Sequence, residues 1–188
     1  MTSNTAKIIL GIDPGTVVMG YGIIEVQGSK TKLIAAGVLQ LSKVDDATLK
    51  LKKIFDRVSS LIVEYCPDEL AIEAPFYGKN VQSMLKLGRA QGVAIAAALY
   101  KEIPVQEYSP RKIKQAVTGK GSASKEQVAA MLKQTIGFDV TPKFLDATDA
   151  LAVAVCHSLQ KSLSSENKKN YTGWKAFLVN NPEKLKKS

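Results

Sequence analysis

The sequence predicts an α/β fold in which helices cover both faces of a five-stranded mixed sheet. The first strand-like segments are joined by short connections, which is typical of an antiparallel meander. Later strand-like segments alternate with helical ones, which is typical of β-α-β units with parallel strands. The chain has 188 residues, 45% of them hydrophobic and 23% charged. These values indicate one soluble globular core, with room for a tail but hardly for a second domain.

The first expected strand, at residues 8–13, is the segment around which the rest of the chain is organised. Its apolar run predicts a strand buried on both faces. Pro14 and Gly15 end the strand, because proline removes a ladder donor and glycine permits a turn. Asp13 either opens this turn or presents a carboxylate to a cleft, and the segment alone leaves both readings open.

The remaining elements follow from hydrophobic periodicity and from turn and capping residues. Strands are expected at residues 8–13, 20–27, 32–41, 69–73 and 104–108. Helices are expected at residues 47–65, 80–100, 109–118, 124–136 and 144–161. Side chains able to cap the first four helices are Asp45 or Asp46, Asn80, Ser109 and Ser124. The core domain is therefore expected at residues 1–161, followed by a lysine-rich basic tail at residues 162–188 that either wraps DNA or keeps the protein soluble.

The formal net charge of +9 favours a polyanionic partner, with nucleic acid first and an anionic membrane surface second. No apolar run is long enough to span a bilayer, and the first five residues lack the features of a signal peptide. We therefore expect a cytoplasmic protein with no membrane partner. In that reducing compartment Cys66 and Cys156 are expected to be free, buried thiols.

Acidic residues stand in otherwise apolar surroundings at three places. Asp13 and Glu73 each end an expected buried strand, and Asp146 and Asp149 lie three residues apart on the last apolar helix, hence on one face. If the two strands are neighbours, all four carboxylates share one cleft, where they raise one another's pKa and favour a divalent cation such as Mg²⁺ or Mn²⁺. The alternative is that Asp146 interacts with the helix dipole and Asp149 is solvated.

Four segments together resemble the RuvC-type Holliday junction resolvases of bacteria. They occur in the family's order and with similar spacing between about residues 7 and 157, and as a set they are highly specific. The segments are Gly11-Ile12-Asp13-Pro14-Gly15, Ile72-Glu73-Ala74-Pro75-Phe76, Gly119-Lys120-Gly121-Ser122-Ala123 and Asp146-Ala147-Thr148-Asp149-Ala150-Leu151-Ala152.

This resemblance implies a ribonuclease H-like nuclease domain at residues 1–161 and a homodimer. It also implies that the protein resolves four-way junction DNA in recombination and repair by paired symmetric nicks. The reaction would be Mg²⁺-dependent hydrolysis with two ions per subunit, Mn²⁺ being able to substitute, and would leave 5′-phosphate and 3′-hydroxyl ends. By carry-over, Asp13, Glu73, Asp146 and Asp149 are the catalytic carboxylates that bind the metal. A branch-migration motor of the RuvA–RuvB type is a plausible further partner.

Several groups could hold DNA. Phe76 follows the Glu73 strand and by itself would be expected to cap the core, but the resemblance implies that it stacks on bases. Lys114 and Lys125 match basic positions that the family uses at its active site. Arg111 and Lys120 cluster with them around the glycine-containing loop and could contact phosphates.

Two further features have competing interpretations. His157, the only histidine, is expected to be packed and hydrogen-bonded rather than to bind metal. Gly88, Gly92 and Ala96 recur every four residues on one helix, which permits close approach of another helix. Internal packing is the ordinary explanation for such a stripe, whereas the resemblance assigns this helix to the dimer interface.

Three other functions compete with junction cleavage. Gly11 to Thr16 also fits the first phosphate motif of sugar kinases and actin-like ATPases, but the chain is too short for their second lobe. A junction-binding module without catalysis would gain nothing from four carboxylates facing phosphate. Other ribonuclease H-like nucleases stay open, because shared carboxylates determine chemistry better than substrate.

Overall fold

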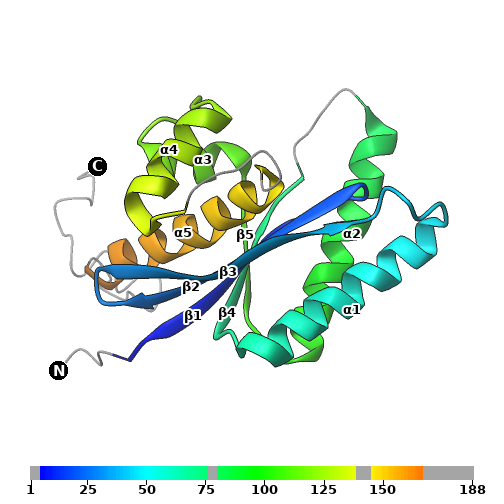
Figure 1. Ribbon diagram of the computed structural model, residues 1–188, viewed down its shortest axis with the longest axis horizontal. Helices are drawn as coiled ribbons and strands as arrows, with labels where there is room; N and C mark the ends of the chain where they lie inside the picture. The colour runs from blue at the N-terminus through cyan, green and yellow to red at the C-terminus, as the bar shows by residue number, and fades with distance from the viewer. Residues whose placement is uncertain (1–4, 76–79, 139–144, 167–188) are drawn as a thin grey trace, which may run out of the picture.

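The computed structural model describes residues 5–75, 80–138 and 145–166 and contains a five-stranded sheet of order β3-β2-β1-β4-β5 (Figure 1). The strands are β1 (Lys7–Asp13), β2 (Val18–Gln27), β3 (Lys30–Gln40), β4 (Glu69–Glu73) and β5 (Val105–Tyr108). The helices are α1 (Ala47–Tyr65), α2 (Val81–Tyr100), α3 (Pro110–Thr118), α4 (Lys125–Ile136) and α5 (Leu145–Glu166). β1 to β3 form an antiparallel meander, whereas β4 pairs in parallel with both β1 and β5. The predicted fold class and strand directions are confirmed.

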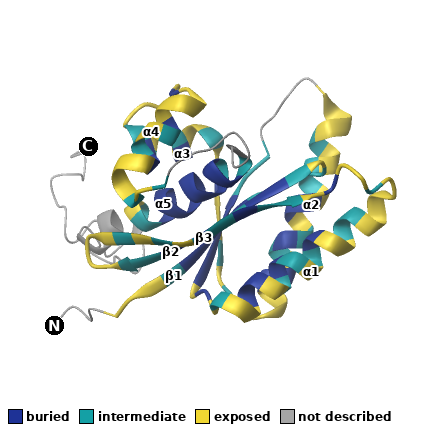
Figure 2. Ribbon diagram, in the orientation of Figure 1, coloured by how far each residue is buried: buried dark blue, intermediate teal, exposed yellow. Residues whose placement is uncertain are grey.

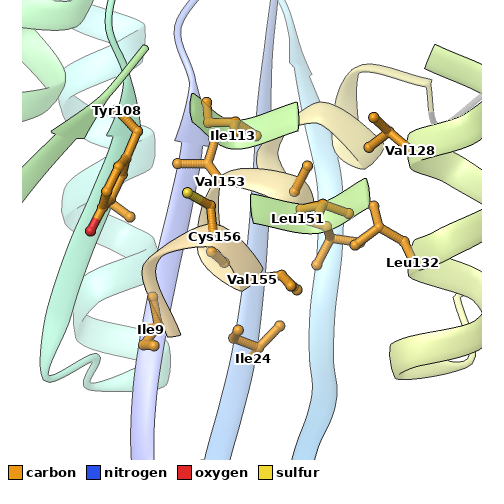
Figure 3. Close-up of a cluster of buried hydrophobic side chains, with 14 of the residues drawn as sticks. Ile9, Ile24, Tyr108, Ile113, Val128, Leu132, Leu151, Val153, Val155 and Cys156 are labelled. Atoms are coloured by element: carbon orange, nitrogen blue, oxygen red, sulfur yellow. The ribbon is translucent and has the colours of Figure 1, made fainter. Parts of the chain in front are cut away.

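Helices cover both faces of the sheet (Figure 1). Leu10 and Ile12 of β1 pack in one core with buried residues of α1 and α2. Ile9 packs in the second core, which α3, α4 and α5 complete on the opposite face (Figure 3). Because side chains alternate along a strand, Asp13 lies on the same face as Ile9 and therefore toward α5.

Glycines on β1 and β2 allow α5 to lie directly on the sheet. A Cβ atom at Gly11 would lie 2.2 Å from the carbonyl oxygen of Ala150, and one at Gly20 would lie 2.0 Å from that of Asp146. Any larger residue at these positions would push the helix outward. This close approach brings the start of α5 to the end of β1, since Gly20 pairs with Asp13.

The helix starts agree with the capping residues expected from the sequence. The Asp46 side chain accepts the Leu49 N–H at 2.8 Å, and Asn80 accepts the Ser83 N–H at 3.0 Å. Ser109 caps α3, and Ser124 caps α4 in a reciprocal capping box. Exposed residues of α1 and α2 lie on the side away from the sheet (Figure 2).

Several details differ from the expectations. β2 begins at Val18 rather than at residue 20, and β3 begins at Lys30 rather than at residue 32. α5 continues to Glu166, past the expected end of the domain at residue 161. The rest of the expected tail lies outside the described residues. Both cysteines are free, but Cys66 is exposed rather than buried; it lies at the C-terminal cap of α1, in a left-handed conformation with φ of 46°. Among the described helices, none combines the length and the apolar character needed to cross a membrane.

Candidate active site

The four carboxylates expected to act together come from three elements. Asp13 ends β1 and Glu73 ends β4, and their predecessors Ile12 and Ile72 are paired in register. Asp146 and Asp149 project from the first turns of α5. The parallel pairing of β1 with β4 therefore places two strand-end carboxylates side by side, and α5 adds two more.

Three of these residues meet closely enough to share a cation. Asp13, Asp146 and Asp149 can each offer one carboxylate oxygen such that all three oxygens lie within 4.8 Å of one another. Glu73 lies outside that trio but lines the same cavity of about 260 Å³ as Asp13 and Asp149. The predicted convergence is thus observed as a tight trio with Glu73 beside it.

The cluster is electrostatically unfavourable without a counterion. Burial, followed by repulsion from Glu73 and Asp149, raises the pKa of Asp13 from 3.8 to about 8. Burial, followed by repulsion from Asp149, raises the pKa of Glu73 from 4.5 to about 7. A bound cation would relieve both effects, since it favours the charged form of each carboxylate.

Two of the predicted lysines reach the same cavity. Lys125, the first residue of α4, donates from Nζ to Oδ2 of Asp149 at 2.5 Å, and this hydrogen bond raises its pKa. Lys114 of α3 lines the cavity and opposes the rise in the pKa of Glu73. Both ammonium groups lie where a phosphate approaching the carboxylates would meet them.

Arg111 and Lys120 lie beside the cavity rather than in it. They line an open groove of about 720 Å³ that shares Lys114 with the carboxylate cavity. The side chain of Gln115 fixes the glycine loop of this groove, since it accepts the Gly121 N–H at 2.9 Å and donates to the Gly119 carbonyl at 2.6 Å. Phe76, the predicted stacking residue, lies outside the described residues.

Sequence reasoning missed the residues that support the carboxylates. Gln91 of α2 donates to Glu107 at 2.6 Å and reaches the backbone carbonyl of Glu73 at 3.5 Å. The available signal was a single polar residue among the alanines that recur at helical spacing on this face of α2. Gln91 thus links α2 to the end of β4.

His157 is packed and hydrogen-bonded, as predicted. Its Nε2 lies 2.5 Å from Oε2 of Glu69, and its Nδ1 lies 2.8 Å from the Tyr108 hydroxyl. Lys7 adds an ion pair to Glu69 at 3.4 Å. These contacts tie α5 to β4 and β5 below the carboxylate cluster. Glu69 was not expected to take part, because it lies 88 residues from His157 in the chain.

The donor set fits a hard divalent cation. Carboxylate oxygens are the ligands that Mg²⁺ and Mn²⁺ prefer, and the described residues here contribute neither a thiolate nor an imidazole to the cluster. The pKa values of Asp13 and Glu73 stay raised although Lys125 and Lys114 lower them, so the described cations offset the repulsion only in part. Asp13, Asp146, Asp149 and Glu73 are the residues that could hold such ions.

Residues 9–157 match the family model described as crossover junction endodeoxyribonuclease RuvC. The chain belongs to this family. A RuvC from Cytophaga hutchinsonii is 62% identical over 180 residues, covering 96% of this chain and 88% of that protein. A RuvC from Bacteroides fragilis is 58% identical over 182 residues, covering 96% of each chain. Membership in the RuvC family favours a nuclease over the ATPase alternative.

Solved structures agree with this assignment. The T. thermophilus RuvC in complex with Holliday junction substrate is 31% identical with a TM-score of 0.78, covering 85% of this chain and 97% of that one. The yeast mitochondrial Holliday junction resolvase Ydc2 shares the fold at 14% identity and a TM-score of 0.66, covering 84% of this chain and 80% of that one. The ribonuclease H-like architecture expected from the resemblance is confirmed.

Proposed function

We propose that the protein is a divalent-metal-dependent endonuclease that resolves four-way DNA junctions by paired symmetric nicks. The observation that carries this proposal is the convergence of Asp13, Asp146 and Asp149 within 4.8 Å, with Glu73 in the same cavity. The names of the relatives and the junction in the T. thermophilus complex support the choice of substrate.

The reaction is hydrolysis of a phosphodiester. Bound Mg²⁺ ions would activate a water and stabilise the charge on the leaving oxygen. The water oxygen attacks phosphorus and gives up a proton, the bond from phosphorus to the 3′ oxygen breaks, and that oxygen gains a proton. The products are a 5′-phosphate and a 3′-hydroxyl. Two ions per subunit are expected, with Mn²⁺ as a substitute, and Asp13, Glu73, Asp146 and Asp149 are the residues that would hold them.

The chain's basic residues place the phosphate. Lys125 and Lys114 face the carboxylate cavity and would attract the phosphate oxygens and the charge that develops on them. Arg111 and Lys120 would contact phosphates of the same strand in the adjoining groove. Phe76 stays a proposed base-stacking residue on the strength of the family resemblance.

The exposed face of α2 supports a homodimer. A Cβ atom at Gly88 or Gly92 would meet nothing within 4 Å, so packing inside this chain does not require these glycines. Leu85 and Leu99 on the same face are 53% and 58% exposed. The internal-packing interpretation is therefore wrong, and a second copy crossing at the glycines would bury this face and pair two active sites for symmetric nicking.

A branch-migration motor of the RuvA–RuvB type and a cytoplasmic location complete the proposal. The family resemblance supports the motor, which would move the crossover to a cleavable position, and the cytoplasmic location carries over the expectation from the sequence.

Incubation of a labelled four-way junction with Mg²⁺ tests the proposal. The wild-type protein should make paired nicks in opposed strands, Asp146→Asn should cut at least about 10³-fold more slowly, and Asp56→Asn should behave as wild type. Asp56 is a suitable control because it is exposed on α1, where it pairs with Lys52. Equal cutting by wild type and Asp146→Asn, or equally fast cutting of linear duplex, would overturn the proposal.

A further inference from the structure

The carboxylate cluster opens on a second side, away from α3 and α4. A hollow of about 540 Å³ begins at Asp146 and is lined by the turn after β1 and by Ser83, Lys86 and Leu87 of α2. The basic site residues predicted from the sequence, Arg111, Lys114, Lys120 and Lys125, lie around the α3–α4 loop and not in this hollow. The basic group in this hollow is Lys86.

This hollow continues outward. A further hollow of about 300 Å³ shares Thr16, Val17 and Lys86 with it and adds Arg89 and Lys50. Asp45 also lines the outer hollow and reduces its positive charge. Lys86, which lines both hollows, is therefore the best-placed cation on this side, and Arg89 is the next.

Both basic side chains are exposed in the single chain, and Arg89 shares the α2 face of Leu85 and Gly92 that is proposed for the homodimer, whereas Lys86 lies beside it. Lys86 and Arg89 are exposed, and neither forms an ion pair with any residue in the described part of the chain. Val17, at the point where the two hollows join, is 58% exposed. It offers an apolar contact of the kind that a sugar or base could cover.

Hollows that share lining residues lie on both sides of the carboxylates. On the α3–α4 side, the cavity of about 260 Å³ and the groove of about 720 Å³ share Pro110 and Lys114. On the α2 side, the hollow of about 540 Å³ begins at Asp146, which offers a carboxylate oxygen within 4.8 Å of one from Asp13 and one from Asp149. Basic groups therefore flank the acidic centre on both sides, which suits an extended polyanion rather than a single phosphate.

We infer that the scissile strand continues past the carboxylates into the α2-side hollow, where Lys86, supported by Arg89, binds a backbone phosphate beyond the cleaved one. This inference rests on the proposed nuclease function and adds a second flank to its DNA path. Lys86 and Arg89 lie three residues apart on α2, so their side chains are neighbours on the helix surface. Binding by both flanks holds the strand across the cluster.

Binding of a labelled four-way junction in metal-free buffer, over a series of salt concentrations, tests this contact. We compare wild type, Lys86→Ala, Arg89→Ala, Lys86→Arg and the control Lys30→Ala. Lys30 is exposed at the β2–β3 turn, which is the opposite end of the sheet from Asp13. Melting temperatures check that each variant is folded.

We expect Lys86→Ala to weaken binding several-fold and to lower the slope of log K against log salt by about one, as loss of one phosphate contact requires. Arg89→Ala should show a smaller change of the same kind, and Lys86→Arg should restore the slope. In cutting assays with Mg²⁺, Lys86→Ala should raise KM and leave kcat near the wild-type value.

The inference is overturned if Lys86→Ala shows the same affinity and salt slope as Lys30→Ala. It is also overturned if its affinity falls with no change in slope, because then no phosphate contact was lost. Failure of the wild-type protein to bind or cut the junction would instead overturn the proposed function.

Discussion

The two glutamates of β4 face the same helix but have opposite surroundings. Glu69, at the start of the strand, is paired with His157 and Lys7. Glu73, four residues later and on the same strand face, shares its cavity with Asp13 and Asp149, and burial and repulsion raise its pKa to about 7. The fold thus neutralises a buried carboxylate where it serves structure. At the end of the strand, Lys114 and Lys125 offset the repulsion only in part, so a bound cation would stabilise the charged form of Glu73 further.

Replacing Glu73 by glutamine should mainly affect activity, whereas replacing Glu69 by glutamine should mainly affect stability. Glu73→Gln should lower the cutting rate by about 10³-fold, since a metal-binding oxygen is lost, and should leave the metal-free protein at least as stable. Glu69→Gln should lower the free energy of unfolding by about 2–4 kcal/mol, because His157 loses its charged partner. Urea unfolding and junction-cutting rates measure the two effects. If both variants changed the cutting rate and the free energy of unfolding in the same way, the two glutamates would not have the different roles described above.

The close contact between Gly20 and α5 should hold Asp146 in position beside the other carboxylates. Gly20→Ala should destabilise the protein by about 1–3 kcal/mol, because the new Cβ would collide with the Asp146 backbone. Since the helix must shift, metal affinity should fall as well. Thermal unfolding and metal titration would show this, and a variant with wild-type values for both would exclude a tight packing requirement at Gly20.

The stability of the metal-free protein should depend on pH because the pKa of Asp13 is raised. The pKa of Asp13 is about 8 in the folded protein against 3.8 ordinarily, so the folded state binds more protons between these values. Stability should therefore fall as pH rises through that window, and Asp13→Asn should reduce the fall by on the order of 2 kcal/mol. Denaturant unfolding at a series of pH values measures this. A wild-type curve that does not fall would contradict the raised pKa.

The smallest effect is expected on the other face of the sheet. Gly92→Ala adds a Cβ that meets nothing in this chain, so it should stabilise the monomeric fold by about 0.5–1 kcal/mol. The same Cβ would separate two copies packed through α2, so the dimer should weaken. Light scattering over a range of protein concentrations and thermal unfolding report the two changes. Loss of stability without any change in association would argue against the α2 interface.

Local patterns predicted most of the fold. The capping residues Asp46, Asn80 and Ser124 each precede the helix expected from them. The parallel direction of residues 69–73 and 104–108 followed from the β-α-β pattern, whereas the pairing of residues 69–73 with the first strand entered only as a condition of the site hypothesis. These features depend on residues near one another in the chain.

Contacts between distant residues could not be predicted in this way. Glu69 reads as the polar start of a strand until His157 lies against it, and Gly20 reads only as the first residue of an expected strand until α5 packs on it. Lys125 was expected to contact DNA, but its ion pair with Asp149 needed the packing of α4 against α5. Cys66 was expected to be buried, although its position at the end of α1 exposes it.

Calorimetric titration of the metal-free protein with Mg²⁺ near neutral pH tests the central claim most directly. We expect saturable binding accompanied by proton release, since carboxylates with raised pKa values must lose protons to bind metal. We also expect Asp149→Asn to abolish this binding and Asp56→Asn to leave it unchanged. Absence of binding to the wild type, or equal binding by wild type and Asp149→Asn, would contradict the claim that these carboxylates hold the ions.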